Sequence, residues 1–225
     1  HTLLVITGRP ANDIIAELLA AIADGFVLPM TSDYRLFEAD VEHLEDRIEV
    51  EYKFAHDRLQ QAAYLSIPDA DRKPMHLRIG RQLARDPGRW EVLKIVSQLN
   101  LAGELVTDPA ERLAIARLNL QAGEKAKWAA ANQSAFKFFV AGLSFLLPVG
   151  SVTTESADVL DPGAAAFATD YDLSLSLTGR AAESAYLLAD FPSMDRLADS
   201  ALKNARSWQD KVEIYQVRIN ALTAQ

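Results

Sequence analysis

The spacing of apolar residues in the first 67 positions switches between helical and strand-like. Helical spacing predicts short helices at 2–8 and 9–26, ended by Gly8 and Gly25. Period-two alternation or short apolar runs then predict strands at 26–29, 34–39 and 47–54. After Asp57 the helical spacing returns, and Leu59, Ala63 and Ile67 form one apolar stripe over about three turns.

Two helices, a strand hairpin and a further helix is the element order of a winged-helix domain without its first helix. From Pro68 onward all the spacing is helical, and the predicted helices are 70–85, 89–104, 108–125, 128–147, 168–188, 191–206 and 208–224. Asp69, Asp108 and Asp190 lie at the expected starts of helices. We therefore expect a mainly α-helical protein, with a partial winged-helix unit at 1–67 and a helical region at 68–225.

Within the helical region, small and aromatic residues fall at the spacing of a tetratricopeptide repeat. The first set is Gly123, Ala126, Ala135, Phe139 and Gly142, and a second, weaker set is Ala182, Ala185, Met194, Ala198 and Ala201. Small residues would allow two helices to approach, and Phe139 would fill the space between them. The two sets lie 59 residues apart, so we expect an inserted loop near 148–168, which is rich in Ser, Thr, Gly, Pro and Asp. An irregular helical bundle is the alternative to such a solenoid.

Composition narrows the classes of function. The net charge of −8 argues against a general binder of nucleic acid or of anionic membranes. The absence of cysteine excludes disulfides and thiolate metal sites and is compatible with a cytoplasmic protein. The apolar run at 138–150 is too short to cross a bilayer, and the first residues lack the basic region of a signal peptide.

Most catalytic motifs are missing. The sequence has no phosphate-binding loop of the G-x-x-x-x-G-K-[ST] type, no G-x-G-x-x-G turn and no G-x-S-x-G elbow. One enzyme hypothesis remains, an all-helical metal phosphohydrolase whose ligands would be His43, the His56–Asp57 pair and Asp71. Against it, the His-Asp pair follows a strand, and His43 lies in a charged connection.

His56 and Asp57 stand where the predicted strand gives way to a helix. Backbone N–H groups are unpaired at such a helix N-terminus, and the local field is positive. The pair could therefore bind a phosphate. It could equally cap the helix, because Asp57 with Gln60 resembles a capping box.

At "FAHDRLQQAAY", residues 54–64, the sequence resembles the regulatory region of large bacterial multidomain signal-transduction ATPases. Such chains also carry serine/threonine kinase, GAF and histidine-kinase domains. The resemblance continues through "HLRIGRQL", "QLNLAGELVTDPAERLAIARLNLQAGEKAKWAAA", "DYDLSLSLTGRAAESAYLLADF" and "DKVEIYQVRINALTAQ". It covers nearly the whole chain apart from the insertion.

This resemblance implies a winged-helix domain followed by tetratricopeptide-like helices, both located after an ATPase domain that binds ATP or ADP. In related switch ATPases, the His of a Met-His-Asp motif contacts the phosphate of ADP and holds the closed state. Here Ala55, His56 and Asp57 occupy the matching junction, with Ala55 in place of the Met. The implied partners are the chain's own ATPase domain and downstream signalling domains, with no cofactor bound by these residues alone.

The leading hypothesis is thus a non-catalytic regulatory and protein-interaction module, and the main alternative is a winged-helix transcription regulator. Residues 1–68 hold twelve acidic and five basic side chains, and the helix in the DNA-recognition position has three acidic residues and no Lys or Arg. Such a helix would repel DNA phosphates. In the helical region the expected concave-face positions are Arg117, Leu120, Glu124 and Lys127, which could also be a solvated helix face stabilised by pairs within the helix.

Overall fold

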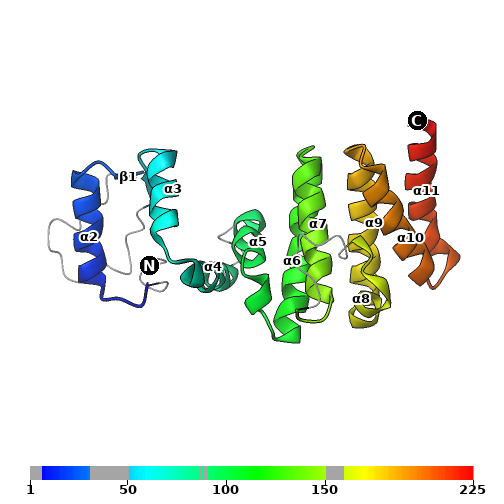
Figure 1. The fold of residues 1–225 in the computed structure, drawn as a ribbon, viewed down its shortest axis with the longest axis horizontal. Helices are drawn as coiled ribbons and strands as arrows, with labels where there is room; N and C mark the ends of the chain where they lie inside the picture. Colours follow the sequence, from blue (N-terminus) through cyan, green and yellow to red (C-terminus); the bar gives the residue numbers. More distant parts are fainter. Residues whose placement is uncertain (1–6, 31–50, 87, 89–90, 151–159, 225) are drawn as a thin grey trace. The chain divides into compact units, whose positions relative to one another are not determined.

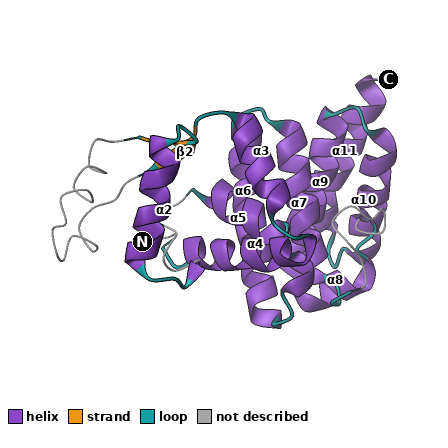
Figure 2. Ribbon diagram, turned by 60° about the vertical axis from the view of Figure 1, so that its left-hand side comes forward, coloured by secondary structure: helices purple, strands orange, loops and turns teal. Residues whose placement is uncertain are grey.

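A computed structural model describes residues 7–30, 51–86, 88, 91–150 and 160–224. Over these residues the protein is mainly helical, with ten α-helices and two short strands, as the sequence predicts (Figures 1 and 2). Its contacts divide the chain into two compact units, 1–82 and 83–225. The sequence places a boundary after residue 67, whereas the first unit extends into the next helix.

The first unit contains α2 (Ala11–Ala23), β1 (Val27–Pro29), β2 (Tyr52–Phe54), α3 (Asp57–Ser66) and most of α4 (Asp69–Ala84). α2 ends as predicted at Gly25, whose φ of +72° is readily adopted only by glycine. β1 and β2 pair antiparallel, with Val27 opposite Phe54. The predicted strand at 34–39 and nearly all of the helix at 2–8 lie outside the described residues. The winged-helix interpretation therefore stays a prediction.

The apolar stripe predicted along α3 is not buried. None of its residues is buried: on the predicted apolar stripe, Leu59 is half-buried and Ala63 is exposed. Its last turn is attached to α4 by polar contacts instead. The Tyr64 hydroxyl lies 3.0 Å from Nε2 of the buried His76, and the Arg72 guanidinium stacks over the Tyr64 ring. α3 thus presents most of its surface outward.

The second unit is a succession of helices whose bounds follow the predicted ones closely. They are α5 (Val92–Asn100), the short 3₁₀ helix η2 (Gly103–Leu105), α6 (Pro109–Trp128), α7 (Asn132–Leu146), α8 (Gly163–Thr169), α9 (Tyr171–Leu187), α10 (Phe191–Asn204) and α11 (Trp208–Ala224). Asp108 and Asp190 cap α6 and α10 as expected, and each carboxylate accepts a hydrogen bond from a backbone N–H in the first turn. The predicted helix 89–104 is interrupted after Asn100. Gly103 lies just after this interruption, and its backbone packs against the Phe145 ring. A Cβ on Gly103 would lie 3.1 Å from Cζ of that ring.

α6 and α7 form a closely packed hairpin (Figure 1). A Cβ on Gly123 would lie 2.3 Å from Cε1 of the fully buried Phe139, so only glycine leaves room for that ring. The next helix approaches in a similar way, because a Cβ on Gly142 of α7 would lie 2.8 Å from Leu177 of α9. The sequence prediction that small residues permit close approach, with Phe139 between the helices, is confirmed.

α9 and α10 repeat this hairpin. The five small or apolar residues predicted for the second set are all buried, including Ala182, Ala185 and Met194. The turns have the same geometry, since Ala130 and Ala189 both adopt positive φ, at 55° and 58°. The residue after each donates to a carbonyl in the preceding helix: Ala131 to Ala126 and Asp190 to Ala185, both at 2.9 Å. The two hairpins therefore share the geometry of their turns.

The prediction of a loop at 148–168 is wrong for residues 163–168. Residues 163–169 form α8, which packs against α7, α9 and α10 and buries Ala166 and Phe167. Alanine has the highest helix propensity, and the run of alanines from 164 to 166 explains why this segment is helical despite its flanking Pro and Gly. Residues 151–159 are outside the described part of the chain.

Candidate functional site

His56 lies at the strand-to-helix junction, as the sequence predicts. It is the N-cap residue of α3, with extended backbone angles, and its side chain makes no capping hydrogen bond. Its carbonyl accepts hydrogen bonds from the N–H groups of Leu59 and Gln60, at 2.9 and 3.2 Å. Asp57 is the first residue of the helix, one position past the cap. A capping box requires its first residue at the N-cap, which is His56, so the predicted capping box of Asp57 with Gln60 is not formed. Asp57 instead places a negative charge near the positive end of the helix.

The ligand set of the phosphohydrolase hypothesis is not brought together in the described part of the protein. His56 and Asp57 begin α3, Asp71 lies in the first turn of α4, and His43 falls outside the described residues. Among the residues that the structure places, no three His, Asp or Glu side chains are grouped to hold a metal ion.

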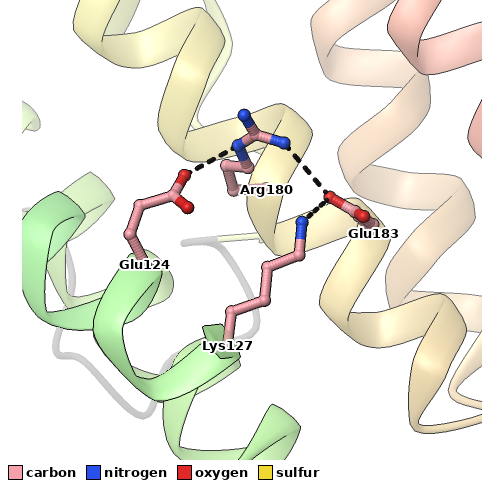
Figure 3. Close-up of polar contacts among 4 residues, drawn as sticks. All are labelled: Glu124, Lys127, Arg180 and Glu183. Atoms are coloured by element: carbon pink, nitrogen blue, oxygen red, sulfur yellow. Dashed lines mark hydrogen bonds and ion pairs between the residues drawn. The ribbon is translucent and has the colours of Figure 1, made fainter. Parts of the chain in front are cut away.

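Two of the expected concave-face residues of α6, Glu124 and Lys127, form ion pairs with α9 (Figure 3). Lys127 Nζ lies 2.5 Å from Glu183 Oε2, and Glu124 Oε1 lies 2.8 Å from Arg180 Nε. Arg180 also reaches Glu183 at 3.4 Å, which joins the two pairs into a chain of four charges. Arg117, near the middle of α6, pairs with Asp170, the N-cap of α9, at 3.1 Å. These side chains therefore hold α6 and α9 together, and the alternative of pairs within one helix is wrong for them.

A groove of about 330 Å³ lies between α9 and α11, directly beside this chain of charges. Its polar lining is Arg180, Glu183, Glu213, Gln216 and Asn220, and its apolar lining includes Tyr186, Leu187, Ile214 and Val217. One side of the groove is α9, the first helix of the α9–α10 hairpin, and the other side is α11, the helix that follows this hairpin. A mixed lining of amides, carboxylates and aliphatic groups is suited to a peptide segment, which offers both backbone polar groups and side chains.

The position of α11 along the groove is fixed at its N-terminus. The Tyr171 hydroxyl of α9 donates to Oδ2 of Asp210 at 2.5 Å, and the same oxygen accepts from the backbone N–H of Arg206 and of Ser207. The Arg206 guanidinium lies 3.9 Å from the centre of the Tyr171 ring. The hydrogen bond from Tyr171 lowers the pKa of Asp210 below its usual range, so the carboxylate stays ionised at neutral pH.

Arg112, near the start of α6, joins this helix to the end of α7. Arg112 is buried and donates to four backbone carbonyls, those of Val106, Ser144, Phe145 and Leu147, at 2.9–3.1 Å. Burial lowers the pKa of its guanidinium, which remains charged and faces the negative end of α7. Asn119 of α6 and Asn100 of α5 exchange two amide hydrogen bonds at 2.8 and 2.9 Å.

Sequence reasoning missed the groove, Arg112 and the Asn100–Asn119 pair. Asn119 carried a usable signal, because it interrupts the apolar face that includes Ile115 and Ala122. Ser207 and Asp210 carried another, because S-x-x-D is a capping pattern and the two residues do bond each other's N–H groups. Arg112 gave no local signal, since three of its acceptors are 32 to 35 residues away.

Comparisons with known proteins give one informative similarity. The chain is 26% identical over 195 residues to hybrid signal transduction histidine kinase G of Dictyostelium discoideum. The match covers 78% of this chain but only 6% of that protein. The chain matches no protein-family model, and no solved structure matches it. In the described parts of the chain, none of the helices has both the length and the apolar character needed to cross a membrane.

Proposed function

We propose that this chain is a non-catalytic regulatory and protein-interaction module of a larger signalling protein of the ATPase or kinase class. The similarity to a signal transduction histidine kinase supports a signalling role, and the resemblance of the 54–64 region supports the ATPase connection. The paired hairpins support the interpretation of 83–225 as a tetratricopeptide-like solenoid. The strand pair and flanking helices of the first unit support a winged-helix remnant.

The observation that carries the interaction role is the groove between α9 and α11. The charged side chains predicted for the concave face are already paired with α9 or its N-cap residue. They are therefore less available to bind a partner. The groove beside them keeps apolar and polar groups open, such as Leu187, which is exposed, and Asn220. We infer that its partner is a peptide segment that inserts an aliphatic side chain and hydrogen-bonds to the amides.

Substitutions in the groove test this role in the full-length protein. Asn220→Arg adds bulk and charge in the groove, and Leu187→Ala removes apolar contact, while neither side chain is in the core. Gln133→Arg, at an exposed position of α7, is the matched control. We expect both groove variants to change the response of the full-length protein to its signal, with unchanged folding, and the control to behave as wild type. A normal response of both groove variants would contradict the proposal.

The finer proposal is that His56 and Asp57 report the nucleotide state of an upstream ATPase domain. Two features support it. The His56 side chain makes no capping hydrogen bond, and α3 buries none of its own residues, so the start of the helix is open to another domain. A helix N-terminus with an adjacent imidazole donor suits the terminal phosphate of ADP. The cofactor would then be ADP or ATP held by the parent protein, with His56 as one contact.

A further inference from the structure

Among the described residues, no ion pair joins α9 to α11 in the way that the pairs of Figure 3 join α6 to α9. The α9 members of those pairs, Arg180 and Glu183, lie three and six residues after Leu177. Ile214 of α11 packs on α10 as Leu177 of α9 packs on α7. α11 has a valine and an amide at the two matching positions, Val217 and Asn220. The groove between α9 and α11 is therefore open at positions that charged side chains bridge between α6 and α9.

Glu213 gives this groove a negative charge that no other group in the described structure balances. The charged side chains of the lining are Arg180, Glu183 and Glu213. Arg180 and Glu183 belong to the chain of Figure 3, whose two acidic and two basic members balance each other. Glu213 is exposed, and it makes no ion pair in the described part of the chain. The net charge of the lining is therefore negative, and the Glu213 carboxylate carries it.

The two basic residues of α11 are not placed to neutralise Glu213. Arg218 is paired with Asp195 and Asp199 of α10, at 3.8 and 2.5 Å. Lys211 is two positions before Glu213, and residues two apart on a helix do not face each other. The positions three and four residues away from Glu213 hold no basic residue: Gln209, Asp210, Gln216 and Val217. A cation that pairs with Glu213 must therefore come from the occupant of the groove.

The contacts between α9 and α11 show where Glu213 lies along the groove. Near the start of both helices, the Tyr171 hydroxyl of α9 donates to Asp210 of α11. Farther along both, Ile214 packs against Gly179, where a Cβ would lie 3.2 Å from the Ile214 side chain. The two helices therefore run in the same direction. Glu213, which directly precedes Ile214, lines the groove near the middle of α9.

The apolar end of the groove lies farther along the same two helices. Leu187 is the last residue of α9, and Asn220 follows Glu213 by seven residues, about 10 Å along the helix axis. An extended peptide rises about 3.3 Å per residue, so two to four residues span about 7–13 Å. A segment of that length can contact Glu213 and Leu187 at the same time.

We propose that the occupant is an extended segment of a partner protein in which a Lys or Arg lies two to four residues from an aliphatic residue. The cation pairs with Glu213, and the aliphatic side chain packs on Leu187 and Val217. Charge complementarity selects a cation at the first position, because a neutral or acidic side chain would leave the carboxylate unpaired. This inference rests on the proposed role of the groove as a peptide-binding site and adds the charge of the peptide.

Peptide selection tests the charge preference. A random peptide library displayed on phage is selected separately on the 225-residue chain and on its Glu213→Lys variant. On the wild type we expect enrichment of Lys or Arg two to four residues from Leu, Ile or Val. On Glu213→Lys we expect Asp or Glu in place of the basic residue. Circular dichroism verifies that each variant folds.

A synthetic copy of the most enriched peptide measures the size of the effect by fluorescence polarisation. We expect Glu213→Gln to raise its Kd about fivefold, as for a partly exposed ion pair. Added salt should weaken binding to the wild type more than binding to Glu213→Gln, because the lost contact is electrostatic. Asp161→Asn makes the same change of charge at an exposed position outside the groove lining and should leave the Kd unchanged.

Leu187→Ala separates failure of this inference from failure of the groove itself, because it removes apolar contact without changing the charge. Peptides that bind Leu187→Ala more weakly than the wild type, but bind Glu213→Gln equally well, would overturn the charge preference and leave the groove as the binding site. No enriched peptide, or enriched peptides indifferent to both substitutions, would overturn the groove as a binding site and this inference with it.

Discussion

Gly123 and Phe139 fit closely against each other between α6 and α7, because a Cβ on Gly123 would lie 2.3 Å from the Phe139 ring. At the counterpart positions α9 and α10 have Ala182 and Ala198, both fully buried. The first hairpin thus has one glycine and one large ring where the second has two small residues. The shared spacing is therefore easier to recognise by burial than by residue identity.

Gly123→Ala separates packing from helix propensity. Propensity alone predicts a gain of about 1 kcal/mol from this change in a helix. Packing predicts the opposite, because the new Cβ would lie 2.3 Å from Phe139. We expect a net loss of about 1–3 kcal/mol in the free energy of unfolding, measured by urea denaturation. In a Phe139→Ala background the same change should become neutral or stabilising. A loss of equal size in both backgrounds would show that the ring is not the cause.

At the scale of elements, local pattern predicts where helices lie but not what holds them together. Most helix bounds from 69 onward, the Asp108 and Asp190 caps and the Phe139 contact followed from spacing and residue type, whereas the break after Asn100 did not. The Arg117–Asp170 and Lys127–Glu183 pairs join residues 53 and 56 positions apart, and no periodicity within α6 distinguishes them from solvated charges. α8 was missed because turn residues flank its short alanine-rich run. The groove between α9 and α11 depends on helix placement and has no sequence pattern of its own.

The Tyr171–Asp210 hydrogen bond between α9 and α11 should make the free energy of unfolding depend on pH in the acid range. The pKa of Asp210 is lowered in the folded protein, chiefly by the hydrogen bond from Tyr171. Its contribution is therefore present above the unfolded-state pKa of about 4, and it is lost as the pH falls through the lower folded-state value. We expect wild type to be more stable than Asp210→Asn at pH 7, and the difference to shrink progressively below about pH 4. Urea denaturation across this range measures it, and a difference that is constant with pH would contradict the assignment.

At the scale of the whole molecule, the distribution of charge argues against DNA binding through the first unit. The helix in the proposed recognition position, α2, carries Asp13 and Glu17, and Asp24 is its C-cap residue. Arg9 just before it is engaged in a two-fold contact with Glu17, at 2.7 and 2.9 Å. A surface of this kind offers DNA little to neutralise phosphates with. The start of α3 could contact a nucleotide, but this sequence has no phosphate-binding loop with which to hold one.

The 225-residue chain alone should bind neither duplex DNA nor ATP tightly. We expect no retarded complex in a mobility-shift assay at low salt, where electrostatic binding is strongest. Calorimetry with ATP and ADP should give no saturable heat in the micromolar range. A sequence-dependent DNA complex would favour the transcription-regulator alternative. A stoichiometric micromolar nucleotide site would show that the chain needs no upstream domain to bind ADP.

The central claim is that this chain regulates a larger protein by responding to its nucleotide. ADP dissociation from the full-length protein, followed together with its basal output, tests that claim most directly. A charge-assisted contact from His56 to phosphate contributes roughly 1.5–3 kcal/mol, so His56→Ala should accelerate ADP release about tenfold to a hundredfold and raise basal output. Gln61→Ala, at an exposed position in the middle of α3, is the control and should leave ADP release unchanged. Unchanged ADP release in a folded His56→Ala protein would contradict the account.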